Sequence, residues 1–509
     1  MFSSVVSGTI YGMQSHIITV EVDFSRGLPC FVMVGMVSPE VRESAERVRI
    51  ALKNIKITLP AMHIAVNLSP GDIKKTGTGF DLPLALGALA NMEIIKKDAL
   101  KDILVMGELG LNGEVKKVNG VLPIIWEGKK HGITQCMVPK DNAIEAALIK
   151  GVKVVGVENI PEIIDYLNSP EGQKDSLIPP TQSDENILWD DKITHDFLDV
   201  SGQEKLKRGA LIAASGFHHM LVMGPPGTGK TMIAQRMPGI MPPLSMEEKM
   251  DITSIYSIAG KLTRDNPVIR TRPFVSVHHS VSPQGITGGG SVPKPGAVSL
   301  AHKGILFLDE LPEFQRQSLD MLRQPLEEKK INIVRTGGIF TYPADIMLVA
   351  AMNPCPCGYY PDVDKCNCTP GAIRHYLGHI SGPILDRIDI CITAEKIKIR
   401  DLQTKDEGKA VMSTSEMLDK VISAHKIQSG RPCLNSYMGV AEIKQYCSLG
   451  TKEKSLMEKA GEKLGISARG YFRTLKVART IADLNNEESI KEDHLIEALS
   501  YRPQLPTAE

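Results

Sequence analysis

The chain has 509 residues, of which 42% are hydrophobic and 23% charged, and its 59 lysines and arginines balance its 59 aspartates and glutamates. This length exceeds what one hydrophobic core can support and predicts about three domains. The balanced charge excludes a uniformly basic surface, so any nucleic-acid contact needs local basic loops, and no apolar run approaches the ~18–20 residues of a membrane span.

The amino terminus and the cysteines indicate the cellular compartment. Residues 1–6 contain neither the basic segment nor the long apolar segment of an export signal. The nine cysteines are odd in number, which argues against a disulfide framework. We therefore expect a cytoplasmic protein with no membrane partner.

Residues 1–168 form the first predicted domain. Residues 16–22 are rich in strand-forming side chains, whereas residues 39–52 and 81–92 favour helices, so the segment is expected to be an α+β domain. Residues 169–191 are polar, contain three prolines and show little periodicity. This composition predicts a linker.

A glycine-rich loop follows an apolar segment within residues 221–231. Glycines allow a sharp turn in which successive N–H groups point at a triphosphate, and the helix that starts near Lys230 adds its positive end. Lys230 would meet the β- and γ-phosphates, and Thr231 would hold Mg²⁺. A purely structural turn before a helix is the alternative. The residues expected to bind nucleotide are Gly224, Pro225, Pro226, Gly227, Thr228, Gly229, Lys230 and Thr231.

A second signal lies at residues 304–310, where an apolar run ends in Asp309 and Glu310. The run is typical of a fully buried parallel strand, and ligands bind at the C-terminal ends of such strands. Asp309 would reach Mg²⁺ through water, and Glu310 would polarise the attacking water. The two motifs together predict an α/β domain over residues 192–395 that hydrolyses ATP.

Two further strand signals follow in the same domain. Residues 331–342 predict a β-hairpin with its turn at residues 336–338. Residues 346–353 are another apolar strand, which ends in Asn353. An asparagine at a strand end more often forms a turn, but after an acidic strand it could hold the attacking water or sense the γ-phosphate.

Four cysteines occur as two Cys-x-Cys pairs, Cys355 with Cys357 and Cys366 with Cys368, in a loop rich in glycine, proline and aspartate. Four thiolates could close a tetrahedral Zn²⁺ site. The one-residue gap within each pair is shorter than the usual zinc-ribbon spacing, so free or redox-active thiols remain the alternative.

Residues 396–509 are rich in lysine and glutamate, and apolar residues recur there at helical spacing, as at Leu475, Ala478 and Ile481. This pattern predicts a helical C-terminal lid.

Several short blocks lie around these motifs, in the order Arg-Pro-Phe at residues 272–274, His-His-Ser at 278–280, Gly-Gly-Gly-Ser at 288–291, Pro-Gly at 295–296, Ser-Leu-Ala-His at 299–302, and the blocks at 304–314, 350–358 and 381–389. In this order, the motifs resemble the AAA+ ATPases, and specifically the magnesium-chelatase-like YifB/ComM family. The resemblance spans essentially the whole chain.

The resemblance implies a homo-oligomeric ring, expected to be a hexamer, with ATP bound between subunits. Arg387 is the implied arginine finger, which would offset charge on a neighbour's transferring phosphoryl group, while a surface pair with Asp386 is the alternative. Arg469 is similar in place to the family's second sensor, with Arg473 as its competitor, and either could face solvent. Residues 199–203 are expected only to lie near the nucleotide.

DNA is the partner that the resemblance implies, through translocation, helicase activity or branch migration in recombination or natural transformation. Related ring ATPases grip substrate with a hairpin in the central pore, so Lys329, Lys330 and Arg335 could contact phosphates or could simply be solvated. Two alternatives remain open: the motor subunit of a metal chelatase, and an ATP-switched regulatory or assembly protein that acts on a protein partner.

The first domain resembles the proteolytic domain of Lon through residues 67–90, 107–109, 112–115 and 131–133. The position of the Lon nucleophilic serine falls on Gly79 and that of the dyad lysine on Leu122, so a Ser-Lys mechanism cannot run. Thr78 and Lys75 are nearby but not aligned with the dyad. The predicted fold is therefore α/β: an α+β, Lon-protease-like, inactive domain, then an AAA+ P-loop domain with a helical lid.

Overall fold

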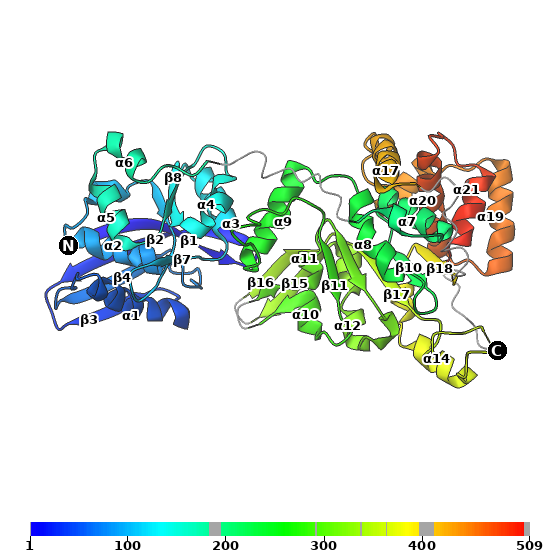
Figure 1. The fold of residues 1–509 in the computed structure, drawn as a ribbon, viewed down its shortest axis with the longest axis horizontal. Coiled ribbons are helices and arrows are strands. Elements are labelled where there is room, and N and C mark those ends of the chain that lie inside the picture. Colours follow the sequence, from blue (N-terminus) through cyan, green and yellow to red (C-terminus); the bar gives the residue numbers. More distant parts are fainter. Residues whose placement is uncertain are drawn as a thin grey trace.

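The computed structural model describes residues 2–182, 195–290, 293–335, 338–362, 364–396 and 412–502. Three parts follow one another along the longest axis of the molecule: an amino-terminal α+β domain, a nucleotide-type α/β domain, and a group of helices (Figure 1). This arrangement confirms the predicted α/β class with a helical C-terminal segment. No helix in the described part of the chain has both the length and the apolar character needed to cross a membrane.

The first domain is built on a mixed seven-stranded sheet in the order β3-β4-β2-β1-β5-β8-β9. Its helix α2 (Asp81–Asn91) is buried along its entire length, because it packs against β1 and β2 of the sheet and against α1 and β6. The strands are β1 (Phe2–Tyr11), β2 (Gln14–Ser25), β3 (Cys30–Val34), β4 (His63–Ser69), β5 (Ile103–Val105), β8 (Gln135–Pro139) and β9 (Lys153–Val157), with a small ribbon of β6 (Glu108–Leu109) and β7 (Val115–Lys116). The other helices are α1 (Pro39–Asn54), α3 (Val121–Lys130), α4 (Lys140–Ala147) and α5 (Ile160–Asn168).

The first half of the predicted linker is folded. Helix α6 (Glu171–Leu177) occupies it, and Lys174 is buried with its amine 5.7 Å from the centre of the Tyr166 ring. The Thr181 N–H donates to the Val154 carbonyl at 2.9 Å, which ties the chain to β9. The polar composition concealed this packing because the lysine stem supplies the apolar surface. Residues 183–191 of the predicted linker lie outside the described residues.

The second domain contains a parallel five-stranded sheet in the order β11-β14-β17-β10-β18. Strands β10, β14 and β17 are buried at every residue, as continuous apolar strands covered on both faces should be. The strands are β10 (Met220–Met223), β11 (Phe274–Val277), β14 (Ile305–Leu308), β17 (Met347–Met352) and β18 (Ile390–Thr393). The helices are α7 (Glu204–Gly216), α8 (Lys230–Ile240), α9 (Met246–Ile258), α10 (Pro283–Thr287), α11 (Ala297–Leu300), α12 (Arg316–Asp320), α13 (Arg323–Glu328), α14 (Pro370–Gly378) and α15 (Gly382–Leu385).

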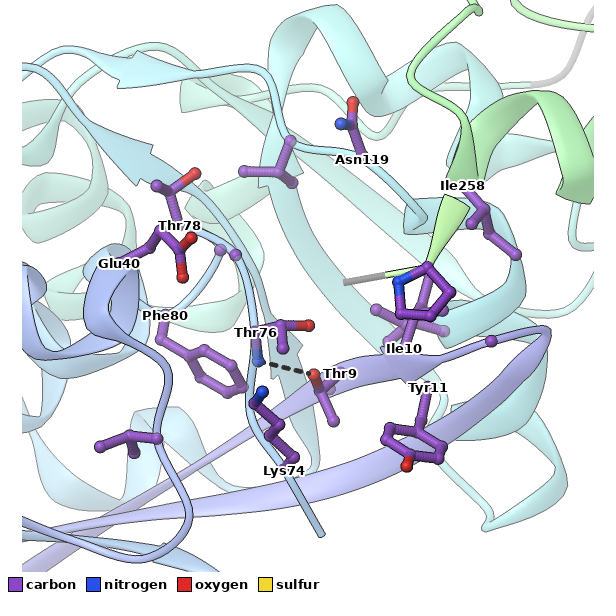
Figure 2. A pocket seen from close by; sticks show the side chains of 18 of the residues that line it. Thr9, Ile10, Tyr11, Glu40, Lys74, Thr76, Thr78, Phe80, Asn119 and Ile258 are labelled. Atoms are coloured by element: carbon purple, nitrogen blue, oxygen red, sulfur yellow. Dashed lines mark hydrogen bonds between the residues drawn. The ribbon is translucent and has the colours of Figure 1, made fainter. Parts of the chain in front are cut away.

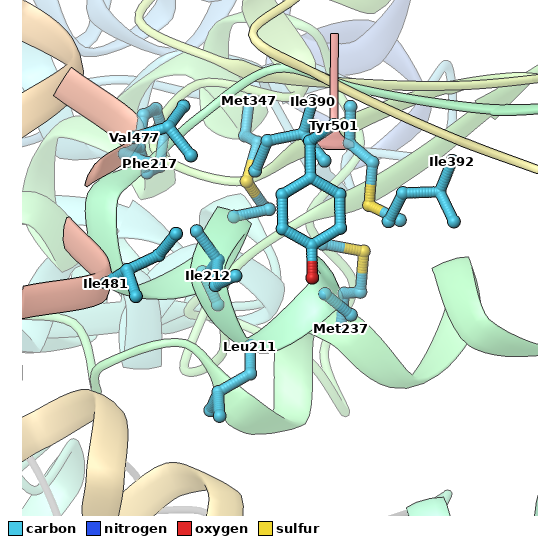
Figure 3. Packing of buried hydrophobic residues seen from close by; sticks show 14 of the residues in the cluster. Leu211, Ile212, Phe217, Met237, Met347, Ile390, Ile392, Val477, Ile481 and Tyr501 are labelled. Atoms are coloured by element: carbon cyan, nitrogen blue, oxygen red, sulfur yellow. The ribbon is translucent and has the colours of Figure 1, made fainter. Parts of the chain in front are cut away.

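The C-terminal helices share one hydrophobic core with the nucleotide domain. Figure 3 shows Val477 and Ile481 of the lid with Ile212 of α7 and Met347 of the sheet, and all four side chains are buried. The lid is therefore packed firmly against α7 rather than joined by a loose hinge. Its helices are α17 (Thr414–Gln428), α18 (Val440–Tyr446), α19 (Thr451–Leu464), α20 (Ala468–Leu484) and α21 (Glu492–Ser500).

In the described residues, the first domain contacts the second at helix α9 and at a β-hairpin. Helix α3 packs against α9, where the Gly120 N–H donates to the Ser257 carbonyl at 3.2 Å (Figure 1). The turn between β1 and β2 meets the hairpin of β15 (Lys330–Arg335) and β16 (Gly338–Pro343), and the rings of Tyr11 and Phe340 lie 4.4 Å apart. The hairpin thus contacts the first domain directly.

Candidate nucleotide site

The phosphate loop lies between the C-terminal end of β10 and the start of α8. Gly227 and Gly229 have φ angles of 76° and 82°, which side chains other than glycine rarely adopt, and Gly229 directly precedes the first residue of α8. The two glycines therefore allow a sharp turn into α8, whose first N–H groups have no partner within the helix and can bind an anion. A cavity of about 380 Å³ above it is lined by residues 226–232, Asp309, Glu310, Met352 and Asn353.

The site residues come from three neighbouring strands. Asp309 follows β14, Asn353 follows β17 and Gly224 follows β10, and the C-terminal ends of parallel strands share one edge of a sheet. The structure therefore brings together residues that are far apart in the sequence, while their roles in catalysis remain predictions.

Lys230 joins the loop to Asn353. Its amine donates to the carbonyls of Gly224 at 2.7 Å and Pro225 at 3.0 Å, and to Oδ1 of Asn353 at 3.1 Å. Burial lowers the pKa of Lys230, and the carboxylates of Asp309 and Glu310 oppose that shift. The amine thus sits between the loop carbonyls and the amide that is predicted to act as a sensor.

Thr231 and Asp309 present oxygen atoms to the same point. The Thr231 hydroxyl donates to Oδ2 of Asp309 at 3.0 Å, and Oδ1 of Asp309 accepts the Glu310 N–H at 2.9 Å. A hydroxyl and a carboxylate are hard oxygen donors of the kind that Mg²⁺ prefers. The donor set therefore fits the metal that the sequence implies.

Glu310 has a partner that sequence reasoning missed. Nδ1 of His279 lies 3.1 Å from Oε2 of Glu310, and the His279 ring lies 4.0 Å from that of His278. The cause is the pairing of β11 with β14: Val277 lies opposite Leu308, so the residues that follow leave the sheet at the same edge. The acidic strand is predicted from the sequence, but its neighbour β11 is not, so no sequence signal points to this contact.

The segment at residues 199–203 reaches the phosphate loop as expected for a nucleotide-proximal segment. The Gln203 side chain donates to the Thr228 carbonyl at 3.0 Å, and the Asp199 carboxylate lies 3.0 Å from the Arg236 guanidinium on α8. These two contacts tie the segment to the phosphate loop and to α8.

Arg387 lies at the opposite edge of the sheet from the phosphate loop. It precedes β18, whose residues Ile390 and Thr393 pair with Met220 and Met223 of β10, so at least roughly 10 Å of strand separates the two edges. Arg387 pairs with Glu327 rather than with Asp386. One chain therefore does not bring Arg387 to its own loop.

Arg469 and Arg473 lie with Arg387, not with the phosphate loop. All three line a cavity of about 420 Å³ between the sheet edge and the lid. Arg473 donates to the carbonyls of Leu385 at 3.1 Å and Ile388 at 2.7 Å, whereas Arg469 is exposed. The three arginines thus gather at one cavity, which is also lined by acidic residues, namely Glu327, Asp345, Asp386 and Asp389.

The predicted hairpin is present and antiparallel, with Ile331 opposite Tyr342. Gly338, which is predicted to lie in the turn, instead begins β16 opposite Arg335, and residues 336 and 337 lie outside the described residues. Val334 and Ile339 near its tip are 66% and 67% exposed. Lys329 instead faces the lid, with its amine 2.9 Å from the centre of the Tyr437 ring. Of the three predicted phosphate contacts, only Lys330 and Arg335 are on the exposed surface.

The four cysteine sulfurs of residues 355, 357, 366 and 368 lie within 4.8 Å of one another. Across the described ranges, they form the one group of three or more side chains placed to hold a metal ion. The pKa of Cys357 is lowered to about 7, chiefly by the Tyr359 backbone N–H. Within the cluster, the neighbouring thiols Cys357 and Cys355 instead raise the pKa of Cys366 to about 12 and raise that of Cys368.

Gly79, the residue that aligns with the nucleophilic serine of Lon, lines a cavity of about 980 Å³ between the first domain and the hairpin (Figure 2). Gly79 and Thr78 are on its wall, where the Thr78 hydroxyl donates to Glu108. The Lys75 amine donates to the Pro70 carbonyl, and Leu122 is fully buried in the core. The hydroxyl and the amine are therefore engaged with different partners.

Comparison with known proteins gives matches along nearly the whole chain. The family described as "Subunit ChlI of Mg-chelatase" matches residues 20–142, "Magnesium chelatase, subunit ChlI" matches residues 196–402, and "Magnesium chelatase, subunit ChlI C-terminal" matches residues 411–502. The second of these spans the phosphate loop, the acidic strand and the four cysteines.

Two relatives are similar over almost their entire length, and a third is similar over 24% of its length. Competence protein ComM of Haemophilus influenzae is 40% identical over 504 residues, or 98% of this chain and 97% of that protein. YifB of Escherichia coli is 40% identical over 493 residues, or 96% and 95% of the two chains. Lon protease 2 of Bacillus subtilis is 29% identical over 136 residues, which are 26% of this chain and 24% of the protease.

Proposed function

Because the chain belongs to the YifB/ComM family of magnesium-chelatase-like AAA+ proteins, we propose that it is a ring-forming ATPase that uses ATP hydrolysis to translocate or remodel DNA. The observation that carries the ATPase part is the meeting of Lys230, Thr231, Asp309, Glu310 and Asn353 around one cavity. We also propose that the protein acts in the cytoplasm, where ATP and DNA are both available.

In this proposal the phosphate loop binds the triphosphate through its backbone N–H groups, and Lys230 neutralises the terminal phosphates. Thr231 and Asp309 would hold Mg²⁺, which would withdraw charge from the phosphate oxygens. Glu310 accepts a proton from the attacking water, and Asn353, 3.1 Å from the Lys230 amine, orients that water against the γ-phosphate.

His279 is proposed to hold Glu310 in position. We expect His279→Ala to lower kcat by roughly tenfold, less than the ~10²–10⁴ that a general base itself supplies, because the carboxylate remains but loses its partner. Phosphate release and nucleotide affinity measure this, and the affinity should be unchanged. His131→Ala is the matched control, since His131 is an exposed histidine of the first domain that does not contact Glu310 or His279. Equal losses in both variants would contradict the positioning role.

The second half of each site is proposed to come from a neighbouring subunit. Arg387 cannot reach its own phosphate loop from the opposite sheet edge, so a ring, most simply a hexamer, would bring it to the next subunit's ATP. Arg469, which lines the same cavity as Arg387, is proposed as the second sensor in preference to Arg473, because the Arg473 guanidinium already donates to two backbone carbonyls.

DNA is proposed as the substrate because the relative named Competence protein ComM covers nearly the whole chain and because the hairpin presents an exposed arginine. The test is ATP turnover with and without single-stranded or branched DNA, coupled to a junction-unwinding assay. Stimulation by DNA supports the proposal. Stimulation only by a protein or a porphyrin-loaded partner would favour the regulatory or chelatase alternatives instead.

Arg335 is expected to contact DNA phosphate near the hairpin tip. Arg335→Ala should weaken DNA binding without changing basal ATP turnover and should reduce the slope of log affinity against log salt by about 1, because one phosphate contact is lost. Salt titrations of DNA binding measure the slope. Lys101→Ala, an exposed lysine of the first domain, should leave it unchanged. An unchanged slope in Arg335→Ala would remove the hairpin from the DNA path.

The four clustered thiols are also proposed to bind Zn²⁺. The sulfurs of Cys355 and Cys357 lie 3.3 Å apart, and the Cys366 sulfur lies 3.7 Å and 3.6 Å from them. Tetrahedral zinc with Zn–S bonds of about 2.3 Å requires sulfur separations of about 3.8 Å, so the spacing suits four thiolates around one ion.

A further inference from the structure

The metal loop, residues 354–369, begins next to the predicted sensor. Strand β17 ends at Met352, Asn353 follows, and Cys355 is the first sulfur of the cluster. Cys355 is fully buried, and its sulfur accepts the Tyr360 N–H at 3.4 Å. A bound metal ion that holds Cys355 in place would therefore also restrict the backbone at Asn353, which lies two residues earlier in the chain.

The same loop touches the phosphate loop. Gly358 has a φ of 84°, and a Cβ atom there would lie 2.8 Å from Cδ of Pro226 and 3.7 Å from Cγ of Asn353. Only glycine permits this close approach, because 2.8 Å is shorter than a normal carbon–carbon contact. Gly358 thus packs against both Pro226 of the phosphate loop and Asn353 at the end of β17.

The far side of the metal loop leads into a second contact with Asn353. Cys366 and Cys368 precede α14, on which burial raises the pKa of Tyr376 to about 12, while a hydrogen bond from the Asn353 backbone N–H to the Tyr376 hydroxyl opposes that rise. His379, directly after α14, lies with its Nδ1 2.9 Å from the Pro312 carbonyl beyond the acidic strand. One cysteine pair therefore follows Asn353 closely in the chain, and the other pair leads into α14, the helix that contacts Asn353.

Regular secondary structure does not stabilise this loop in its described residues, which form turns and bends without a helix or strand. The ordering of such a segment costs conformational entropy that a bound metal offsets by joining its two ends. Within the described part of the loop, the sulfur cluster is the feature that joins residues 355–357 to residues 366–368.

We propose that Zn²⁺ held by the four cysteines clamps Asn353 and Pro226 in place, so that metal occupancy sets the rate of ATP hydrolysis in the same subunit. The inference rests on the proposed ATPase function. The metal takes no part in the chemistry; it positions the amide and the loop through Cys355 and Gly358.

The test uses the full-length protein produced with zinc. We expect one Zn²⁺ per chain, and replacement by Co²⁺ should give the visible absorption of tetrahedral cobalt thiolate. The variant C366S/C368S should lose the metal and the cobalt spectrum, and its kcat should fall by roughly tenfold or more, as for other groups that orient a site from outside it. Cys433→Ser, a cysteine outside the cluster, is the control and should retain both metal and rate.

Gly358→Ala separates the clamp from the metal and keeps the test decisive if the double variant does not fold. It leaves all four sulfurs in place, so zinc content and the cobalt spectrum should be retained while kcat falls, because the added methyl group displaces Pro226. Zinc-free protein that turns over at the wild-type rate, a wild-type chain that never binds zinc, or a zinc-bound Gly358→Ala variant with unchanged kcat would each overturn the inference. A zinc-loaded wild type with no ATPase activity would instead overturn the proposed function.

Discussion

Replacing Glu310 with glutamine is expected to stop ATP turnover while leaving nucleotide binding nearly intact. The amide has the size of the carboxylate but cannot accept a proton from water, so kcat should fall by roughly 10²–10⁴. Lys230 and the loop backbone, which are proposed to bind the phosphates, do not depend on the Glu310 side chain. Phosphate release and equilibrium binding of ATP measure the two effects separately.

Glu313→Gln is the matched control for this experiment. Glu313 is exposed on the short turn that follows Glu310 and does not line the nucleotide cavity, so its amide should leave turnover unchanged. Turnover of Glu310→Gln at the wild-type rate would refute the assignment of the general base.

The second large effect is expected at Arg387. Arg387→Ala should lower ATP turnover by roughly 10³–10⁵, the range for loss of an arginine finger, although Arg387 lies at the edge of the sheet away from its own phosphate loop. Its guanidinium would act on the ATP of the next subunit, so the loss should appear in kcat. Glu327→Ala is the control, because it removes the Arg387 ion pair but keeps the guanidinium.

Mixing the two inactive variants tests action between subunits. Arg387→Ala subunits retain Glu310, and Glu310→Gln subunits retain Arg387, so interfaces with the former's nucleotide site and the latter's arginine should hydrolyse ATP. A mixture of Arg387→Ala with the Arg387→Ala/Glu310→Gln double variant supplies no arginine and should stay inactive. If mixing restores nothing in either case, the arginine does not act across an interface.

The nucleotide site was largely predictable because its signals are local. A glycine loop after an apolar strand and carboxylates at the end of another both imply the C-terminal edge of a parallel sheet, which is where the structure places Lys230, Asp309 and Asn353. The contact of His279 with Glu310 was missed because it depends on which strands are neighbours, and one sequence does not state the strand order.

Other features required packing that sequence patterns do not report. The polar segment at residues 171–177 is predicted as linker, yet Lys174 is buried beside Tyr166. Lys329 resembles the other basic residues of the hairpin in sequence but faces the Tyr437 ring. The approach of Gly358 to Pro226 joins residues far apart in the chain, and only the folded structure shows it.

The continuous core between lid and sheet bears on how a subunit would move. Ile481 and Val477 are buried in one cluster with Ile212 and Met347, so a large rotation of the lid would expose apolar side chains, at a cost of about 25 cal/mol for each Å² of apolar surface exposed. In the proposed ring each subunit would then move as one rigid body. Closure around one nucleotide would rotate the whole subunit and displace the adjoining subunit, because the lid would not move separately to take up the change.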